Sequence, residues 1–224
     1  MTPGLMPADS APLKERIVTF MRAASIEITT SEHGHLPALR EVLPPGTAVY
    51  VSHVPNATLA QVVGTARAVQ AAGFRATPHI VARRINYPET LRAALAELTA
   101  HGVEQVLLVA GDTEHAAGEF ESTLDVLASG ILEKSDVKGI GVAGYPEGQR
   151  GLGPTLLWNA LKAKQAFADR TGLPLFMVTQ FGFNGNALRN WEPELARNDI
   201  RLPILAGIAG PAPLSKLIKF AMRC

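Results

Sequence analysis

The sequence predicts an α/β protein of the (β/α)8 TIM-type barrel class, lacking its eighth strand or truncated before it, with an extra N-terminal helix. Two observations predict this fold. Apolar, strand-like runs alternate with segments of helical spacing along the 224 residues, and no domain-scale linker interrupts the alternation. Polar residues recur at the C-terminal ends of the apolar runs, where a barrel has its mouth. Residues 1–224 are therefore expected to form a single barrel domain.

The predicted strands are seven apolar runs, at residues 24–29, 48–54, 76–82, 105–111, 139–145, 175–183 and 203–210. The predicted helices that follow them are residues 58–73, 88–102, 121–130, 154–172 and 186–198. A further helix at about residues 11–24 precedes the first strand, and Pro193 is expected to perturb the last helix of this set. The sequence ends at LSKLIKFAMRC, which has the pattern of a seventh helix, so an eighth strand is either absent or part of a longer protein.

A G-x-G-x-x-G pattern at Gly139, Gly141 and Gly144 raises the question of a dinucleotide-binding loop. Such a loop needs a strand before the glycines and a helix that opens on the last one. Here the preceding residues, EKSDVK, are polar, and Pro146 stands where the helix would begin. The glycines alternate with apolar residues, so the pattern predicts a buried strand.

Composition and charge exclude several classes of function. The net charge of +1 gives no basic surface for nucleic acid or an anionic membrane, and no apolar run reaches the ~20 residues of a membrane span. Cys224 is the only cysteine, so neither an internal disulfide nor a cysteine-based zinc site is expected. His33 and His35 are expected in a solvated loop, and no metal is predicted. The N-terminus lacks the regions of a signal peptide, so we expect a cytoplasmic protein, with a homo-oligomer left open.

An open doubly wound sheet is the other fold that this alternation allows. In such a sheet only the strands beside a switch point can direct side chains at one ligand, whereas all the strand ends of a barrel share one mouth. Six of the predicted strands carry a polar residue at or near the C-terminal end: Glu27, His53, His79, Asp112, Tyr145 and Gln180. The barrel is therefore favoured.

Glu27 lies inside the apolar run SIEIT, where a carboxylate is costly unless it is satisfied or functional. A glutamate paired with a neighbouring basic residue is the structural explanation. At a barrel mouth the functional explanation is favoured, because a partly desolvated carboxyl has a raised pKa and can donate a proton.

Asp112 and Gln180 follow or interrupt apolar strands, and a carboxylate and an amide together can bind a heterocycle that offers N–H donors and a carbonyl, such as a pterin or a flavin. For His53 and His79 a core role and a ligand contact both stay open. Arg83 and Arg84 either clamp an anion or form a solvated pair, and the pair is the commoner outcome.

Seven segments occur in the order found in methylenetetrahydrofolate reductases: SIEIT, TPHIVARRI, LLVAGD, VAGYPEG, LKAKQ, MVTQFGF and ILAGIAGP. The sequence resembles this family from about residue 24 to its end, and the combination of AGYPE with TQF is the specific part. The resemblance implies a barrel that binds FAD at its mouth. It also implies reduction of 5,10-methylenetetrahydrofolate to 5-methyltetrahydrofolate with NAD(P)H.

The resemblance also implies roles for single residues. Glu27 matches the general acid, and Asp112 matches the aspartate that contacts the pterin and lies near the flavin. Gln180 matches the folate-contacting glutamine, and Ser52 stands where a flavin-binding threonine is usual. The other residues that match flavin contacts are His79, Gly111, Tyr145 and Lys164.

The sequence departs from the family pattern where relatives hold the diphosphate and adenosine of FAD. Ala110 occupies a position that is commonly arginine, and Gln149 one that is commonly histidine. Apolar residues replace polar ones on the helix before Lys164: Leu157, Ala160 and Ala163. Each lost charge-assisted hydrogen bond is worth about 1.5–3 kcal/mol, so FAD is predicted to bind weakly. Two alternatives stay open: direct hydride transfer from NADH without a flavin, and a non-catalytic subunit that binds folate or flavin.

Overall fold

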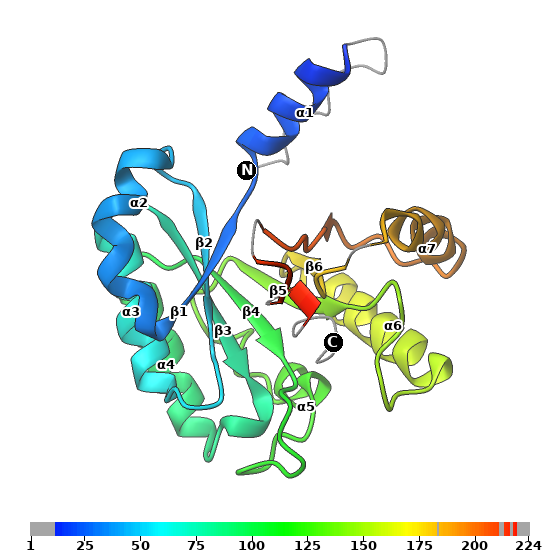
Figure 1. The fold of residues 1–224 in the computed structure, drawn as a ribbon. Coiled ribbons are helices and arrows are strands. Elements are labelled where there is room, and N and C mark those ends of the chain that lie inside the picture. The colour runs from blue at the N-terminus through cyan, green and yellow to red at the C-terminus, as the bar shows by residue number, and fades with distance from the viewer. Residues whose placement is uncertain (1–11, 183, 211–212, 216, 219–224) are drawn as a thin grey trace. The chain divides into compact units, whose positions relative to one another are not determined.

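The computed structural model describes residues 12–182, 184–210, 213–215 and 217–218. Seven strands, each parallel to its paired neighbours, alternate with helices over these residues, which confirms the predicted α/β alternation (Figure 1). The chain divides into two compact units. The first consists of residues 1–79 with 97–104, and the second of residues 80–96 with 105–224.

The first unit contains the paired strands β1 (Ile26–Thr29) and β2 (Ala48–Ser52), and β3 (Arg75–Val81) as far as His79. Its helical elements are α1 (Leu13–Arg22), η1 (Thr30–His35), α2 (Leu36–Val42) and α3 (Leu59–Ala71). The sequence did not predict η1 and α2: His33 and His35 are exposed, as expected, but they lie in a 3₁₀ helix and not in a loop. A capping box formed by Thr29 and Glu32 starts η1, and Pro37 near the start of α2 suits a first helical turn.

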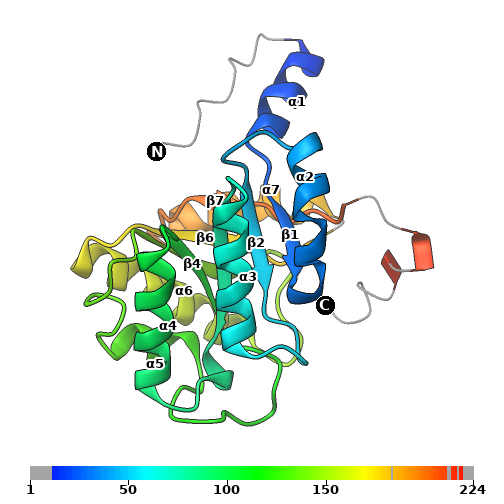
Figure 2. The same ribbon diagram turned by 90° about the vertical axis from the view of Figure 1, so that its left-hand side faces the viewer.

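The two faces of β1, β2 and β3 differ sharply in polarity. Val49, Val51 and Ile80 are fully buried, and they lie on the opposite face to Glu27 and Tyr50 because side chains alternate along a strand. Figures 1 and 2 show α2 and α3 over the same face of these strands. The apolar face therefore packs against helices, which leaves the polar face for other contacts.

Helix α1 projects from the start of β1 (Figure 1), and none of its residues is buried. Leu13, Ile17, Phe20 and Met21 recur at the spacing of one helix face, and each is 48% exposed or more. The predicted N-terminal helix is thus confirmed, and its apolar face is uncovered.

The second unit contains four paired strands: β4 (Gln105–Val109), β5 (Gly139–Gly144), β6 (Leu175–Thr179) and β7 (Ile204–Leu205). Its helical elements are η2 (Ala82–Arg84), α5 (Thr123–Ala128), α6 (Pro154–Thr171) and α7 (Gly185–Arg197), and α4 (Pro88–Ala100) has residues in both units. β7 is much shorter than the predicted run. Pro193 lies inside α7, and the helix continues past it to Arg197, so the expected perturbation does not end the helix.

Packing explains two of the three glycines of β5, which is the strand that the sequence predicted in place of a dinucleotide loop. A Cβ at Gly141 would lie 2.9 Å from both Leu107 Cδ1 and Phe176 Cε2, the side chains on the neighbouring strands. A Cβ at Gly144 would lie 2.8 Å from the ring of Trp191 on α7. The glycines therefore let large side chains cross β5.

The expected seventh helix falls mostly outside the described residues. Leu214, Ser215, Leu217 and Ile218 are helical where the structure describes them, and Cys224 lies beyond the described part of the chain.

Candidate active site

The first unit brings three of the predicted site residues together on the polar face of its strands. Glu27 pairs in register with Tyr50 on β2, and Tyr50 with Thr77 on β3, so these side chains share one face with His79, two residues further along β3. The carboxylate oxygen Oε2 of Glu27 lies 3.6 Å from Nε2 of His79, and the Ser52 hydroxyl donates a hydrogen bond to the Glu27 carboxylate.

Burial raises the pKa of the Glu27 carboxyl above its usual value of 4.5, even though 56% of its side-chain surface is exposed. The hydrogen bond from Ser52 opposes this shift, and the negative charge of Glu32 adds to it. Desolvation is the largest cause, because the charged form loses water that neutral neighbours do not replace. Glu27 therefore has the electrostatic setting that the sequence predicted for a proton donor.

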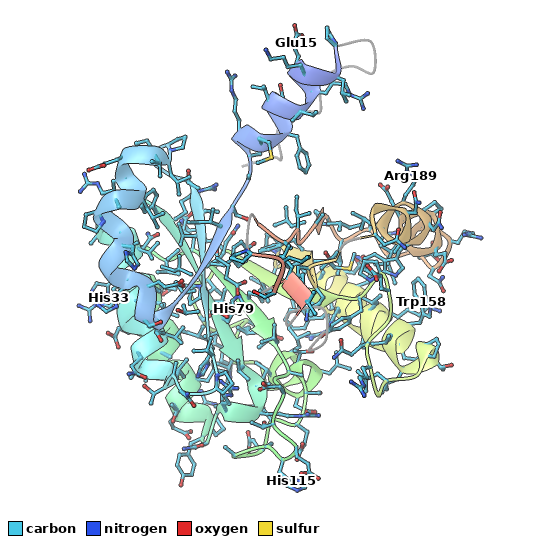
Figure 3. The ribbon with its side chains drawn as sticks, in the orientation of Figure 1. Glu15, His33, His79, His115, Trp158 and Arg189 are labelled. Atoms are coloured by element: carbon cyan, nitrogen blue, oxygen red, sulfur yellow. The ribbon has the colours of Figure 1, made fainter. Side chains whose placement is uncertain are left out.

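His79 is a neutral imidazole in this setting. Its side chain is 13% exposed, and burial lowers its pKa from 6.5 to about 4. The Nε2 atom is buried and makes no hydrogen bond within the described residues, so the Glu27 carboxyl, 3.6 Å away, is the polar group that faces it. Figure 3 shows His79 among the strands of the first unit, whereas His33 lies on the outer side of that unit.

Tyr50 is a member of this face that sequence reasoning missed. Burial, with a contribution from the Glu27 charge, raises the pKa of its phenol to about 12, and its ring meets the His79 ring edge-on with centroids 6.2 Å apart. Its position in the run AVYVS, two residues before Ser52, was the available signal, because alternation places both on one face. His53, by contrast, is 7% exposed, and its Nε2 donates to the Ala57 carbonyl at 3.1 Å.

The second unit holds Asp112 directly after a sharp turn at the end of β4. Gly111 has φ 104°, and a Cβ there would lie 2.5 Å from Val81 Cγ1, so the turn requires glycine. The Asp112 side chain is 71% exposed, and its Oδ1 accepts from Arg84 Nη2 at 2.7 Å. Only 14% of the Arg84 side chain is exposed, so the solvated pair that the sequence favoured is wrong for this residue.

Tyr145 and Gln180 lie at the ends of the neighbouring strands β5 and β6. Gly144 pairs with Thr179, so Tyr145 and Gln180 follow at matching positions, and the Gln180 N–H donates to the Gly144 carbonyl at 3.0 Å. Burial raises the pKa of Tyr145, while Gln180 is exposed. Because β4, β5 and β6 are parallel neighbours, Asp112, Tyr145 and Gln180 lie at the same edge of the second unit's sheet.

Lys164 on α6 is buried, with 5% of its surface exposed, and its ammonium donates to the Ala143 carbonyl of β5 at 3.1 Å. Burial lowers its pKa from 10.5 to about 8. A buried amine costs stability, so its presence close to the C-terminal end of β5 is consistent with a ligand-binding role.

A cavity of about 620 Å³ opens in the first unit between η1, α3 and the loop after β2. Its lining contains no Asp, Glu, Lys or Arg and consists of Thr30, Ser31, His33, Val54, Asn56, Gln61, Gly64 and Thr65. None of the predicted site residues lines it. Among the described residues, no three His, Cys, Asp or Glu side chains are arranged to hold a metal ion. Within the same part of the chain, no helix has the length and hydropathy of a membrane span.

Comparison with solved structures identifies the fold class of this chain. A putative phosphonomutase from Burkholderia cenocepacia matches with a TM-score of 0.56 at 14% identity, over 88% of this chain and 83% of that chain. A mutant tryptophan synthase α-subunit from Pyrococcus furiosus matches with a TM-score of 0.51 at 15% identity, over 89% and 84%. These likenesses show the fold alone, an α/β fold of the TIM-barrel type with seven parallel strands, as the sequence predicted.

The family described as methylenetetrahydrofolate reductase matches residues 47–223. The matched region contains Ser52, Asp112 and Gln180, and Glu27 precedes it. Because the match spans more than half of the chain, the chain belongs to the methylenetetrahydrofolate reductase family.

Proposed function

We propose that this protein reduces 5,10-methylenetetrahydrofolate to 5-methyltetrahydrofolate with NAD(P)H as electron donor and FAD as bound carrier. The setting of Glu27 carries the proposal: a carboxyl with raised pKa on a parallel strand, beside Ser52 and the neutral His79. An acid of this kind can protonate a ring nitrogen of the folate and so assist opening of the imidazolidine ring.

Asp112 and Gln180 bind the pterin in this proposal. The exposed Asp112 carboxylate accepts hydrogen bonds from pterin N–H groups, and the Gln180 amide can both donate and accept. Their place at one edge of the second unit's sheet supports a shared role.

FAD fits the residues present only in part. Ser52, His79, Tyr145 and the buried Lys164 are the groups that would hold the cofactor. On α6, however, Leu157, Ala160 and Ala163 offer no polar group to a diphosphate. When bound, FAD would accept hydride from NAD(P)H and pass it to the folate. We therefore propose weak FAD binding.

The apolar positions on α6 also favour a second candidate, direct hydride transfer from NADH to the folate without a flavin. The third candidate, a non-catalytic subunit that binds folate or flavin, has less support, because a binding subunit has no need of an acid such as Glu27.

Titration of the purified protein with FAD, followed by flavin fluorescence and by an anaerobic assay of NADH-driven folate reduction, separates the three. Weak binding with FAD-dependent activity supports the proposal. Activity without FAD supports the second candidate, and folate or FAD binding without activity supports the third. Binding of neither ligand contradicts all three.

We further propose that residues 1–224 act as one cytoplasmic barrel domain, alone or as a homo-oligomer, and that Glu27 and Asp112 act on the same folate. In that case Glu27→Gln and Asp112→Asn should change folate affinity non-additively, because groups that share a ligand couple energetically. Additive effects would contradict a shared ligand, and sedimentation gives the oligomeric state.

A further inference from the structure

Two arginines follow β3, and neither has a role in the proposed function. Arg83 and Arg84 form η2 with Ala82, and both reach the loop that follows β4 in the same unit. Their partners differ: Arg83 binds backbone of the loop, whereas Arg84 binds the side chain of Asp112.

Arg83 fixes the path of the loop. Its N–H donates to the Ala110 carbonyl at 3.0 Å, and its own carbonyl accepts from the Ala117 N–H at 2.8 Å. Its guanidinium donates to the carbonyls of Thr113 and Glu121 at 3.0 and 2.8 Å. Together with the required glycine at 111, these bonds hold the backbone on both sides of Asp112.

Arg84 then fixes the side chain. Only 14% of the arginine side chain is exposed, against 71% of Asp112, so the cation is the enclosed partner and the carboxylate is the accessible one. The 2.7 Å bond uses Oδ1 of Asp112. A charge-assisted bond of this length is short and directional, and it leaves Oδ2 to accept from another donor.

We propose that Arg84 is a positioning residue that orients Asp112 as a fixed hydrogen-bond acceptor, and so selects an uncharged heterocycle with adjacent N–H donors. The pair has no net charge, so a ligand gains little from charge alone and must supply N–H groups aimed at the held carboxylate. The choice of a folate as that heterocycle rests on the proposed function; the orientation of Asp112 does not.

The test compares Arg84→Gln and Arg84→Lys with the matched control Arg92→Gln, which breaks the exposed Arg92–Glu89 pair of 2.8 Å on α4. The first measurement needs no ligand: the χ1 rotamer populations of Asp112, from NMR three-bond couplings. We expect one dominant rotamer in the wild type and in Arg92→Gln, and averaging over several rotamers in Arg84→Gln, with Arg84→Lys between them. An unchanged single rotamer in Arg84→Gln overturns the proposal.

The second measurement is the affinity for 5-methyltetrahydrofolate, with kcat and KM. Loss of one charge-assisted bond predicts affinity about 10- to 100-fold weaker in Arg84→Gln, with KM rising more than kcat falls. In an Asp112→Asn background the same change should have no further effect. An equal further loss there overturns the proposal, because Arg84 would then act independently of Asp112. If the wild-type protein binds no folate, the proposed function fails, and the rotamer result still decides the role of Arg84.

Discussion

Glu27 and Asp112 are the two carboxylates assigned to the candidate site, and their surroundings are electrostatically opposite. Glu27, in the first unit, faces a hydroxyl, a neutral imidazole and a neutral phenol. Asp112, in the second unit, accepts a 2.7 Å bond from a guanidinium. Both carboxylates are exposed, with 56% of the Glu27 side chain and 71% of the Asp112 side chain accessible, so the difference lies in the charge of their partners.

This difference teaches how the surroundings of two carboxylates can suit them to different tasks. Neutral, desolvating neighbours favour the protonated form of a carboxyl, which suits an acid. A cationic neighbour makes a carboxylate a good acceptor, which suits ligand orientation. The predictions below test this division.

The largest expected effect is on the rate of folate reduction in Glu27→Gln. The amide keeps the size of the side chain but cannot deliver a proton, so we expect a loss of about 10²–10⁴-fold. Reduction of FAD by NAD(P)H should be unchanged. Stopped-flow measurement of the two half-reactions checks this, with Asp112→Asn as the comparison that should mainly raise KM. Equal losses in both half-reactions of Glu27→Gln would make it a structural or cofactor-binding residue.

His79 should make the protein acid-sensitive. Its pKa is lowered from 6.5 to about 4, so between these values the unfolded state binds a proton that the folded state resists. Stability from this group is complete above pH 6.5 and falls by up to about 3 kcal/mol as the pH drops to 4. Glu27 has the opposite effect on stability. Because its pKa is raised in the folded state, its protonation on acidification favours folding.

Urea unfolding of wild type and His79→Gln across this pH range checks the prediction. The variant should lose less stability on acidification than the wild type. The same pH dependence in both proteins would show that His79 is not held neutral by the fold.

Lys164→Met should stabilise the protein at neutral pH. The pKa of Lys164 is lowered from 10.5 to about 8, so its stability contribution is lost as the pH falls through this window, and the burial cost remains at pH 7. We expect a gain of about 1–2 kcal/mol after allowing for the lost bond to the Ala143 carbonyl. Denaturant unfolding, with the exposed Lys162→Met on the same helix as control, measures it. A loss of stability would show that the bond to Ala143 outweighs the burial cost.

The smallest effect is expected at Ser52. Its hydroxyl bond lowers the pKa of Glu27 against the effect of burial, so Ser52→Ala should raise that pKa further. The pH profile of folate reduction should shift to higher pH on the limb that reports the acid. Ser52→Thr keeps the hydroxyl and should restore the wild-type profile. An unchanged pH profile in Ser52→Ala would show that Ser52 does not affect the pKa of Glu27.

Local patterns predicted the strands and most helices, because apolar periodicity reports directly which residues face a core. They also placed Glu27, Asp112 and Gln180 near strand ends. The capping-box spacing of Thr29 and Glu32 is visible in the sequence, and it indicates the start of a helix where a loop was expected. The pairing of Arg84 with Asp112, 28 residues away, could not be predicted from the sequence. It depends on the path of the chain that brings η2 next to the end of β4.

The most direct test of the account is the pKa of Glu27 itself, measured by a ¹³C NMR titration of the glutamate side-chain carboxyls. Assignment comes from the resonance missing in Glu27→Gln, and neither cofactor nor substrate is needed. The account predicts a midpoint above 4.5 that rises further in Ser52→Ala. A midpoint at or below 4.5 would contradict the assignment of Glu27 as the acid of this site.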